Sequence, residues 1–174
     1  MNHTVLLPDP EATWALGEQV AGLLRAGDVV ILSGDLGAGK TTLAQGIGRG
    51  LGVRGPVTSP TFVIARVHPA TGTGPGLVHV DAYRLGSAAE LDALDLDTTL
   101  EEFVTVIEWG EGLAEALAPD RLEVLLERDL RGADGGRAED ADPRRARLRG
   151  IGPRWADTAL DKIDVGREAR IGGV

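Results

Sequence analysis

The sequence predicts a three-layer α/β fold, in which helices flank a mostly parallel central sheet. Two observations predict it. Short apolar segments typical of strands alternate along the chain with segments of helical spacing. The segment Gly34–Thr41, which reads GDLGAGKT, follows one such strand and opens a helix. It fits the phosphate-binding pattern G-x-x-x-x-G-K-[ST], so the predicted fold is of the P-loop NTPase type.

The first third of the chain contains the strand, loop and helix that this prediction needs. Asp9 is a typical helix N-cap, and Pro10 suits the first helical position. Thr13, Leu16, Val20 and Leu23 recur at helical spacing, and Gly27 is the expected end of that helix. The predicted elements in this part are a strand at 3–7, a helix that begins after Asp9, a strand at 28–33 and a helix at 41–51.

Strands and helices continue to alternate in the rest of the chain. Further strands are predicted at 62–67, 77–83, 103–108, 122–126 and 146–151, and further helices at 112–117 and 155–163. Ser87 and Glu90 form a capping box that opens one more short helix. Residues 129–146 are rich in Gly, Arg and acidic residues, which predicts a mobile excursion. We expect one domain over residues 1–174, with a frayed C-terminus.

Composition limits the classes of function. The chain has 174 residues, of which 43% are hydrophobic and 26% charged, with a formal net charge of −9 and no cysteine. The negative charge disfavours autonomous nucleic-acid binding, which requires clustered basic surface, so a role on nucleic acid would pass through a partner. The absence of cysteine excludes disulfides and Cys-based zinc sites. No apolar run approaches the length of a membrane span, and we expect a soluble cytoplasmic protein.

The glycine-rich loop predicts a nucleotide-phosphate site. Backbone N–H groups and the positive end of the following helix dipole point at the anion in such loops. Lys40, one of only two lysines in the chain, can reach the β and γ phosphates, and Thr41 can offer its hydroxyl to Mg²⁺. The residues expected to bind the nucleotide here are Asp35, Gly37, Ala38, Gly39, Lys40, Thr41 and Thr42.

Two carboxylates close apolar strands and are candidate catalytic acids. Asp81 ends one such strand and Glu108 ends another. Ligands of α/β sheets bind at the carboxyl ends of the strands, so we expect both side chains to face the nucleotide. Which of the two lies closer to the metal stays open. His79, Asp81 and Tyr83 alternate on one predicted strand, and His79 could orient a carboxylate or a water, or could be an ordinary core histidine.

Three further features have two interpretations each. Thr58, Ser59 and Thr61 lie in a turn, and spacing alone favours an ordinary turn. GTPases use a similar segment as a switch that the γ-phosphate orders. Trp109 could stack near the nucleotide or pack in the core, whereas Trp14 and Trp155 are expected core residues. The segment Asp161–Asp164 superficially matches the guanine-reading motif of GTPases, but it lacks the Asn and is expected in a helix, which favours ATP over GTP.

Four segments in this order resemble one family. They are Gly34–Thr42 (GDLGAGKTT), Thr58–Phe62 (TSPTF), His79–Arg84 (HVDAYR) and Ile107–Trp109 (IEW). Together they are similar to the TsaE (YjeE) family, the bacterial ATPases required for threonylcarbamoyladenosine modification of tRNA. The resemblance covers about residues 5–128, and the excursion after them looks like an addition.

The resemblance implies more than the spacing does. It implies ATP and Mg²⁺ as cofactors, with Thr41 and Glu108 as metal ligands and Asp81 as the catalytic or water-positioning acid. It implies a switch-like role for Ser59 and Thr61 near the γ-phosphate, and a place near the nucleotide for Trp109. It also implies TsaB and TsaD as partners, whose assembly ATP hydrolysis would reset, with tRNA contacted only through them.

Two other functions remain open on sequence grounds. One is a small-molecule kinase whose lid would use the arginines of the region after residue 128. These are Arg131, Arg137, Arg144, Arg145, Arg147 and Arg149. The other is a nucleotide-dependent binding module without useful turnover, against which the two acidic strand ends argue mildly.

Overall fold

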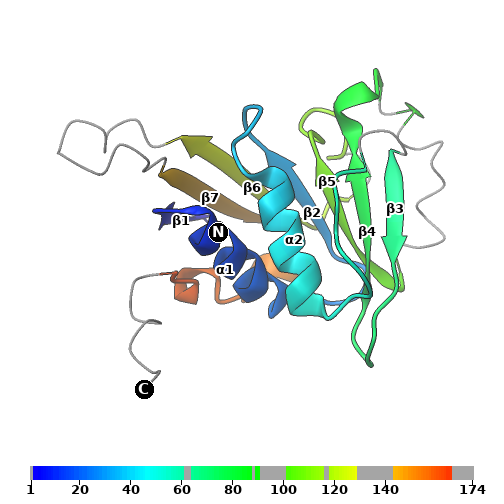
Figure 1. Ribbon diagram of the computed structural model, residues 1–174, viewed down its shortest axis with the longest axis horizontal. Coiled ribbons are helices and arrows are strands. Elements are labelled where there is room, and N and C mark those ends of the chain that lie inside the picture. Colours follow the sequence, from blue (N-terminus) through cyan, green and yellow to red (C-terminus); the bar gives the residue numbers. More distant parts are fainter. Residues whose placement is uncertain are drawn as a thin grey trace.

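One seven-stranded sheet organises the part of the chain that the computed structural model describes, which is residues 2–60, 64–87, 89–90, 101–115, 118–128 and 143–165. The strands lie in the order β1-β7-β6-β2-β5-β4-β3 (Figure 1). Their bounds are β1 Asn2–Leu7, β2 Val29–Ser33, β3 Ala65–His68, β4 Gly76–Asp81, β5 Phe103–Glu108, β6 Arg121–Arg128 and β7 Arg144–Ile151.

Only the centre of the sheet is parallel. The adjacent strands β6, β2, β5 and β4 pair in parallel. At one side β7 runs antiparallel to β6 and to β1, and at the other β3 runs antiparallel to β4. The predicted mostly parallel sheet is therefore correct for the four strands around the glycine-rich loop and wrong for the flanks. The cause at β3 is its short connection to β4, because parallel neighbours need a long crossover.

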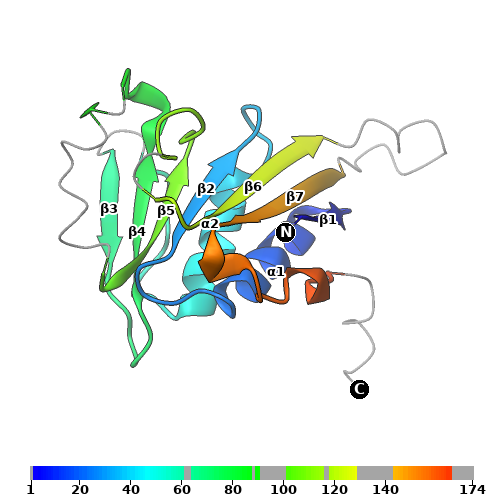
Figure 2. The ribbon, with the colours of Figure 1, turned by 180° about the vertical axis from the view of Figure 1, so that it is seen from behind.

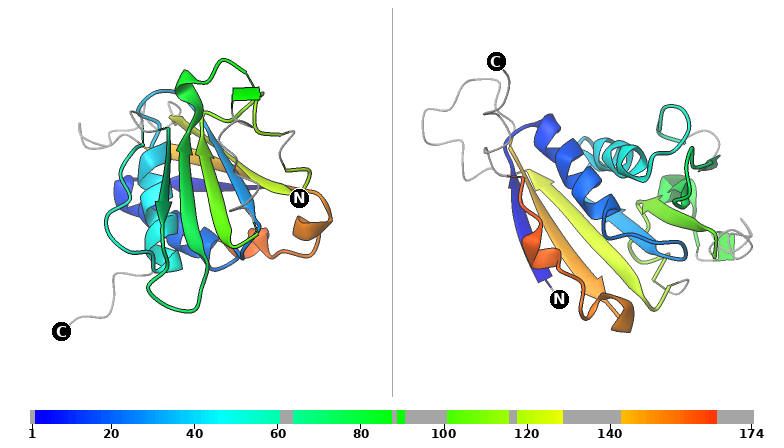
Figure 3. Two further views of the ribbon diagram at one scale, coloured as in Figure 1. Left: turned by 90° about the vertical axis from the view of Figure 1, so that its right-hand side faces the viewer. Right: turned by 90° about the horizontal axis from the view of Figure 1, so that it is seen from below.

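Two α-helices pack side by side on one face of the sheet, α1 (Pro10–Ala21) and α2 (Lys40–Leu51) (Figures 1 and 3). The predicted cap of α1 is confirmed, since the Asp9 carboxylate accepts a hydrogen bond of 2.8 Å from Ala12 N–H and Pro10 opens the helix. The predicted end at Gly27 is wrong. Gly22 is the C-cap, and Gly27 (φ 90°) lies in the turn before β2.

Both faces of the central strand β2 are buried. Val30 and Leu32 belong to the core beneath α1 and α2, and Val29 and Ile31 belong to a second apolar cluster on the opposite face. Among the described residues, those that pack on that second face (Figure 2) from outside the sheet are Ala82, Leu85, Leu113, Ala114 and Ala118. A helix was predicted at 112–117, and its last two residues lie outside the described part of the chain.

The predicted C-terminal helix at 155–163 is wrong. Two short 3-10 turns, Pro153–Trp155 and Leu160–Lys162, replace it. Trp155 and Leu160 are buried from separate turns, and Arg154 between β7 and the second turn bonds to Asp28, so tertiary contacts override the local helical spacing. Trp155 is a core residue as predicted, but Trp14 is 37% exposed and is not.

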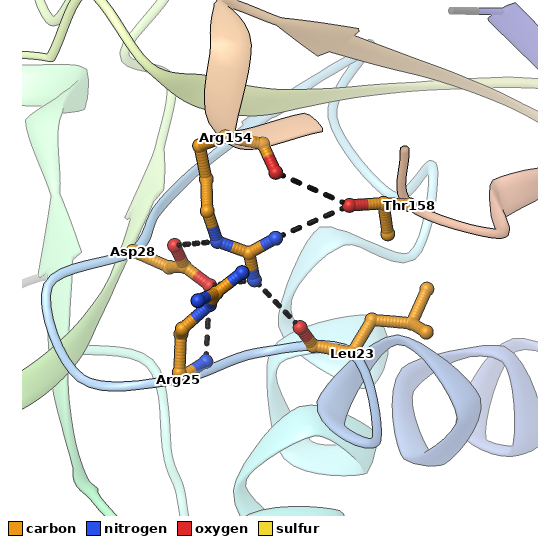
Figure 4. Close-up of polar contacts among 5 residues, drawn as sticks. All are labelled: Leu23, Arg25, Asp28, Arg154 and Thr158. Carbon is orange, nitrogen blue, oxygen red and sulfur yellow. Dashed lines mark hydrogen bonds and ion pairs between the residues drawn. The ribbon is translucent and has the colours of Figure 1, made fainter. Parts of the chain in front are cut away.

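An ion pair holds this C-terminal segment to the turn between α1 and β2 (Figure 4). Arg154 donates two hydrogen bonds to the Asp28 carboxylate, 2.8 Å from Nε and 2.7 Å from Nη2. The same guanidinium donates to Leu23 O and to Thr158 Oγ1, and Asp28 also accepts from Arg25 N–H. Three of these bonds reach the nearly buried Asp28 carboxylate, so the pair joins the C-terminal segment to the turn before β2.

Several other sequence predictions need adjustment. Strand β7 begins at Arg144, so the predicted excursion at 129–146 extends too far, and residues 129–142 lie outside the described part. Strand β3 begins at Ala65, after 61–63, which also lie outside it. At the predicted capping box, Ser87 Oγ accepts from Glu90 N–H at 3.3 Å. In the described part of the chain no helix is long and apolar enough to cross a bilayer.

Candidate nucleotide site

The glycine-rich loop connects β2 to α2 at the carboxyl end of the parallel strands. Gly34, Gly37 and Gly39 have φ angles of 133°, 76° and 105°, a region that side chains disfavour. At Gly34 a Cβ atom would also lie 2.2 Å from Leu126 O, so any larger residue would displace β6. Gly39 is the N-cap of α2, and the helix N-terminus therefore faces the loop.

Lys40 is buried inside this loop. Its Nζ donates to Gly34 O at 2.7 Å and to Asp35 O at 2.9 Å, and lies 3.6 Å from the centre of the Trp109 ring. Desolvation lowers the pKa of Lys40, while the charges of Glu108, Asp35 and Asp81 act in the opposite direction. The loop thus holds an ammonium group among carbonyl oxygens, with three carboxylates in its field.

Thr41 and Glu108 are in contact, 67 residues apart in the chain. Thr41 Oγ1 donates to Glu108 Oε2 at 3.1 Å, and the carboxylate is 3% exposed. A threonine hydroxyl with one carboxylate fits Mg²⁺, which takes one or two carboxylates and completes its shell with phosphate and water. No cluster of three or more His, Cys, Asp or Glu side chains occurs among the residues described, so an all-protein metal cage is not built there.

Asp81 lies beside Glu108, because the two residues are partners in the register of β4 and β5. It is 6% exposed, and its Oδ1 accepts from Tyr83 N–H at 3.0 Å. Strand β4 ends at Asp81, and Ala82–Arg84 forms a 3-10 turn, so Tyr83 does not share a strand face with His79 and Asp81 as predicted. Thr41 contacts Glu108, and in this geometry Glu108 is the better placed of the two to share a metal with it.

Trp109 and Tyr83 form one wall of the site. Trp109 has a φ of 61°, uncommon for a residue of this size, and such backbone strain gathers at functional sites. The Tyr83 ring lies 5.2 Å from the Trp109 ring and is 67% exposed. The position of Trp109 near the loop, rather than in the core, follows from its contact with Lys40.

A cavity of about 440 Å³ unites most of the predicted site residues. Its lining is Leu36, Gly37, Gly39, Lys40, Thr41, Thr42, Ser59, Asp81, Tyr83, Glu108 and Trp109. Ala38 is buried beneath the loop, Asp35 contributes its carbonyl oxygen to Lys40, and Thr61 lies outside the described residues. A larger hollow of about 750 Å³ lies against β6 and β7 and contains none of the predicted site residues, so the smaller one is the candidate site.

Sequence reasoning named Arg144 only as a possible lid residue and did not single out Arg128, and both lie beside the loop. Arg144 Nη2 donates to Gly37 O at 3.3 Å, and Arg128 approaches the same glycine. The Arg144–Gly37 contact joins positions 107 apart, for which local spacing carries no signal. Leu36, 85% exposed at the cavity rim, was missed because the loop pattern allows any residue there.

The alternative of a kinase lid gains no support from the described part of the chain. Four of its six arginines lie in strand β7, and Arg131 and Arg137 lie outside the described residues. Arg147 pairs with Glu127 at 2.9 Å, and Arg149 lies 3.8 Å from Glu123, both across to β6. These side chains hold two strands together. Lys162 lies in a 3-10 turn rather than at a strand end, so the resemblance to a guanine-reading motif has no structural support.

Comparisons with known proteins agree with this architecture. The family model of TsaE, described as threonylcarbamoyl adenosine biosynthesis protein TsaE, matches residues 7–135. A Streptomyces coelicolor protein named tRNA threonylcarbamoyladenosine biosynthesis protein TsaE is 58% identical over 142 residues, 81% of this chain and 92% of the relative. A Bacillus subtilis protein of the same name is 38% identical over 125 residues, 69% of this chain and 74% of the relative.

A solved structure extends the likeness to the fold. The crystal structure of Bacillus subtilis YdiB aligns with a TM-score of 0.66 and 31% identity, over 89% of each chain. Since 89% of 174 residues is about 155, the likeness continues beyond residue 128, where the sequence resemblance stopped. Strand β7 lies between β1 and β6 in the sheet of this protein, so it is part of the domain.

Fold and site together define a protein of the P-loop type, with the loop at the carboxyl end of a parallel sheet centre and two acidic strand ends beside it. Within that class, the chain belongs to the TsaE family.

Proposed function

We propose that this protein binds ATP with Mg²⁺ and hydrolyses it as a component of threonylcarbamoyladenosine biosynthesis at adenosine 37 of tRNA. The observation that carries the proposal is the contact of Thr41 with Glu108 next to Lys40. A hydroxyl, a buried carboxylate and a lysine at the N-terminus of a helix are the groups with which P-loop proteins hold a triphosphate and its metal.

Each residue has a distinct task in this proposal. The loop N–H groups surround the phosphates, and Lys40 exchanges its loop carbonyl partners for β and γ phosphate oxygens. Thr41 and Glu108 hold the metal, which, when bound, offsets charge on the β and γ phosphate oxygens. Asp81 accepts a hydrogen bond from the attacking water and orients it. Trp109 and Tyr83 restrict solvent at one side of the cavity, and Ser59, which also lines it, contacts the terminal phosphate in this proposal.

The proposal includes partners. The TsaE relatives carry the name of a tRNA modification step, and the resemblance implies that TsaB and TsaD carry out the transfer itself. We place this chain beside them in the cytoplasm as the component whose ATP hydrolysis resets the assembly. A net charge of −9 supports a role in which other proteins hold the tRNA.

Phosphate release tests the proposal. ATP and Mg²⁺ are supplied to the chain alone, to TsaB–TsaD alone, and to the mixture. We expect slow release by the chain alone and faster release in the mixture, because phosphoryl transfer is slow until the charge around the γ-phosphate is complete. Fast hydrolysis that ignores the partners would contradict the coupling. ATP binding without release in any mixture would indicate a binding module, and transfer to a small acceptor would indicate a kinase.

A further inference from the structure

The two carboxylate oxygens of Glu108 have different partners. Oε2 accepts the hydrogen bond from Thr41 Oγ1 at 3.1 Å. Oε1 lies 2.7 Å from Nε2 of His79. The shorter contact is on the side away from the cavity, because Glu108 lines the cavity and His79 does not. One oxygen is therefore held from within the protein, and the other faces the proposed metal site.

His79 reaches Glu108 from the neighbouring strand. It lies on β4, two residues before Asp81, opposite Val106 of β5. Its side chain is fully buried, with no exposed surface. Burial of a polar ring in an apolar layer costs free energy unless the ring is hydrogen-bonded, and the carboxylate of Glu108 supplies that bond.

The hydrogen-bond pattern shows which nitrogen carries the proton. A carboxylate only accepts, so Nε2 of His79 is the donor. Nδ1 has no hydrogen-bond partner among the residues described, and a bare ring nitrogen is cheaper to bury there than an unpaired N–H group. The arrangement is that of an imidazole which donates from Nε2 to the carboxylate of Glu108.

We infer that His79 is a positioning residue, which holds Oε1 of Glu108 and so keeps Oε2 directed at Thr41 and the metal. The inference rests on the proposed function, because the metal belongs to it. A carboxylate free to rotate would divide its time between orientations, and only some of them would place an oxygen beside Thr41. Outer hydrogen bonds to metal ligands commonly act in this way.

A set of single variants separates positioning from simple core packing. His79→Leu removes the donor at similar volume, and His79→Asn shortens the side chain so that its amide falls short of Glu108. His79→Gln places an amide donor nearer the carboxylate. The matched control is His68→Leu, since His68 is also a buried histidine (4% exposed), on the edge strand β3, and no contact of its side chain with Glu108 occurs in the structure.

The measurement is ATP binding by calorimetry over a Mg²⁺ series at constant pH, with thermal unfolding of each variant without ATP or Mg²⁺. For His79→Leu and His79→Asn we expect the Mg²⁺ concentration at half effect to rise on the order of 10- to 100-fold. His79→Gln should recover part of that loss. ATP binding without Mg²⁺ should not change, and His68→Leu should leave the Mg²⁺ dependence as in the wild type even if its melting temperature falls.

A double variant supplies the second criterion. In a Glu108→Gln background, His79→Asn should not raise the Mg²⁺ concentration at half effect any further, because the carboxylate that His79 positions is already gone. The inference is overturned if Leu and Asn at position 79 lower only thermal stability and shift the Mg²⁺ dependence by less than about twofold. Additive losses in the double variant would overturn it as well. If ATP binding by the wild type does not depend on Mg²⁺, the proposed metal site itself is wrong. That result is distinguishable from a failure of the role of His79, which leaves the Mg²⁺ dependence of the wild type intact.

Discussion

At the scale of single residues, Lys40 should decide nucleotide affinity. Its ammonium group is bound to two loop carbonyls, Gly34 O and Asp35 O, and faces the cavity. Charge-assisted hydrogen bonds contribute about 1.5–3 kcal/mol each, so Lys40→Ala should weaken ATP binding by at least about tenfold. Calorimetry measures the loss. Lys162→Ala is the control, because it removes the other lysine of the chain at an exposed position. Unchanged ATP affinity in Lys40→Ala would remove the P-loop interpretation.

The two acidic strand ends should have separable roles. Glu108 accepts a hydrogen bond from Thr41, whereas the carboxylate of Asp81 accepts one from Tyr83 N–H. Glu108→Gln should therefore weaken the Mg²⁺ dependence of ATP binding, and Asp81→Asn should slow hydrolysis more than it weakens binding. Binding and single-turnover hydrolysis are measured on both variants. Equal losses of binding in the two would show that the tasks are not divided in this way.

The burial of His68 should make the free energy of unfolding depend on pH. Burial is the largest cause that lowers the pKa of His68 below its ordinary value of 6.5, and the neighbouring His79 and Arg66 act in the same direction. The unfolded chain then binds the proton first, so the free energy of unfolding is unaffected above pH 6.5 and falls as the pH drops below it. Urea unfolding between about pH 7.5 and 5 should show a shallower fall for His68→Gln than for the wild type. Parallel curves would contradict the prediction.

At the scale of elements, the Arg154–Asp28 ion pair should stabilise the fold. Both side chains are largely buried, at 14% and 6% exposure. Arg154→Ala leaves the Asp28 carboxylate without its main partner, and breaking such a buried pair costs about 3–5 kcal/mol. The control is Arg147→Ala, whose pair with Glu127 is exposed at 56% and 41% and should contribute about 0–1 kcal/mol. Urea unfolding compares them, and similar losses would show that the C-terminal segment contributes little.

Elements with local signals were predictable from the sequence, and long-range contacts were not. The strand Phe103–Glu108 was predicted with its observed bounds, because an apolar run ends there at an acid. The rule that ligands bind at the carboxyl ends of parallel strands predicted that Asp81 and Glu108 face the nucleotide, and the family resemblance implied the pairing of Thr41 with Glu108. The antiparallel flanks depend on which strands pair, for which spacing along the chain carries no signal.

The C-terminal segment shows the same limit. Its residues favour a helix locally, but Trp155 packs against Gly150 and Arg154 binds Asp28, 126 positions away. Tertiary contacts then override local preference. The sequence did not predict the contact of His79 with Glu108 for a related reason. Strand alternation placed His79 near an acid, but only the register of β4 and β5 determines which acid it meets.

At the scale of the whole molecule, charge should keep the isolated protein off tRNA. The net charge is −9. Arg147 and Arg149 of β7 pair with Glu127 and Glu123 of β6, so these two arginines do not form a free basic surface. Binding to phosphate backbones depends on basic side chains that release counterions.

We therefore expect the isolated chain to bind tRNA more weakly than about 10⁻⁴ M at physiological salt, the weak end of non-specific binding. Fluorescence anisotropy with labelled tRNA measures this, first with the chain alone and then with TsaB–TsaD present. An Arg147→Glu, Arg149→Glu double variant is the control. Its tRNA binding should remain undetectable, and the salt dependence of tRNA binding by the full mixture should not change. Tight binding by the isolated wild-type chain, lost in the double variant, would instead identify strand β7 as a direct RNA contact and would revise the division of tasks between this protein and its partners.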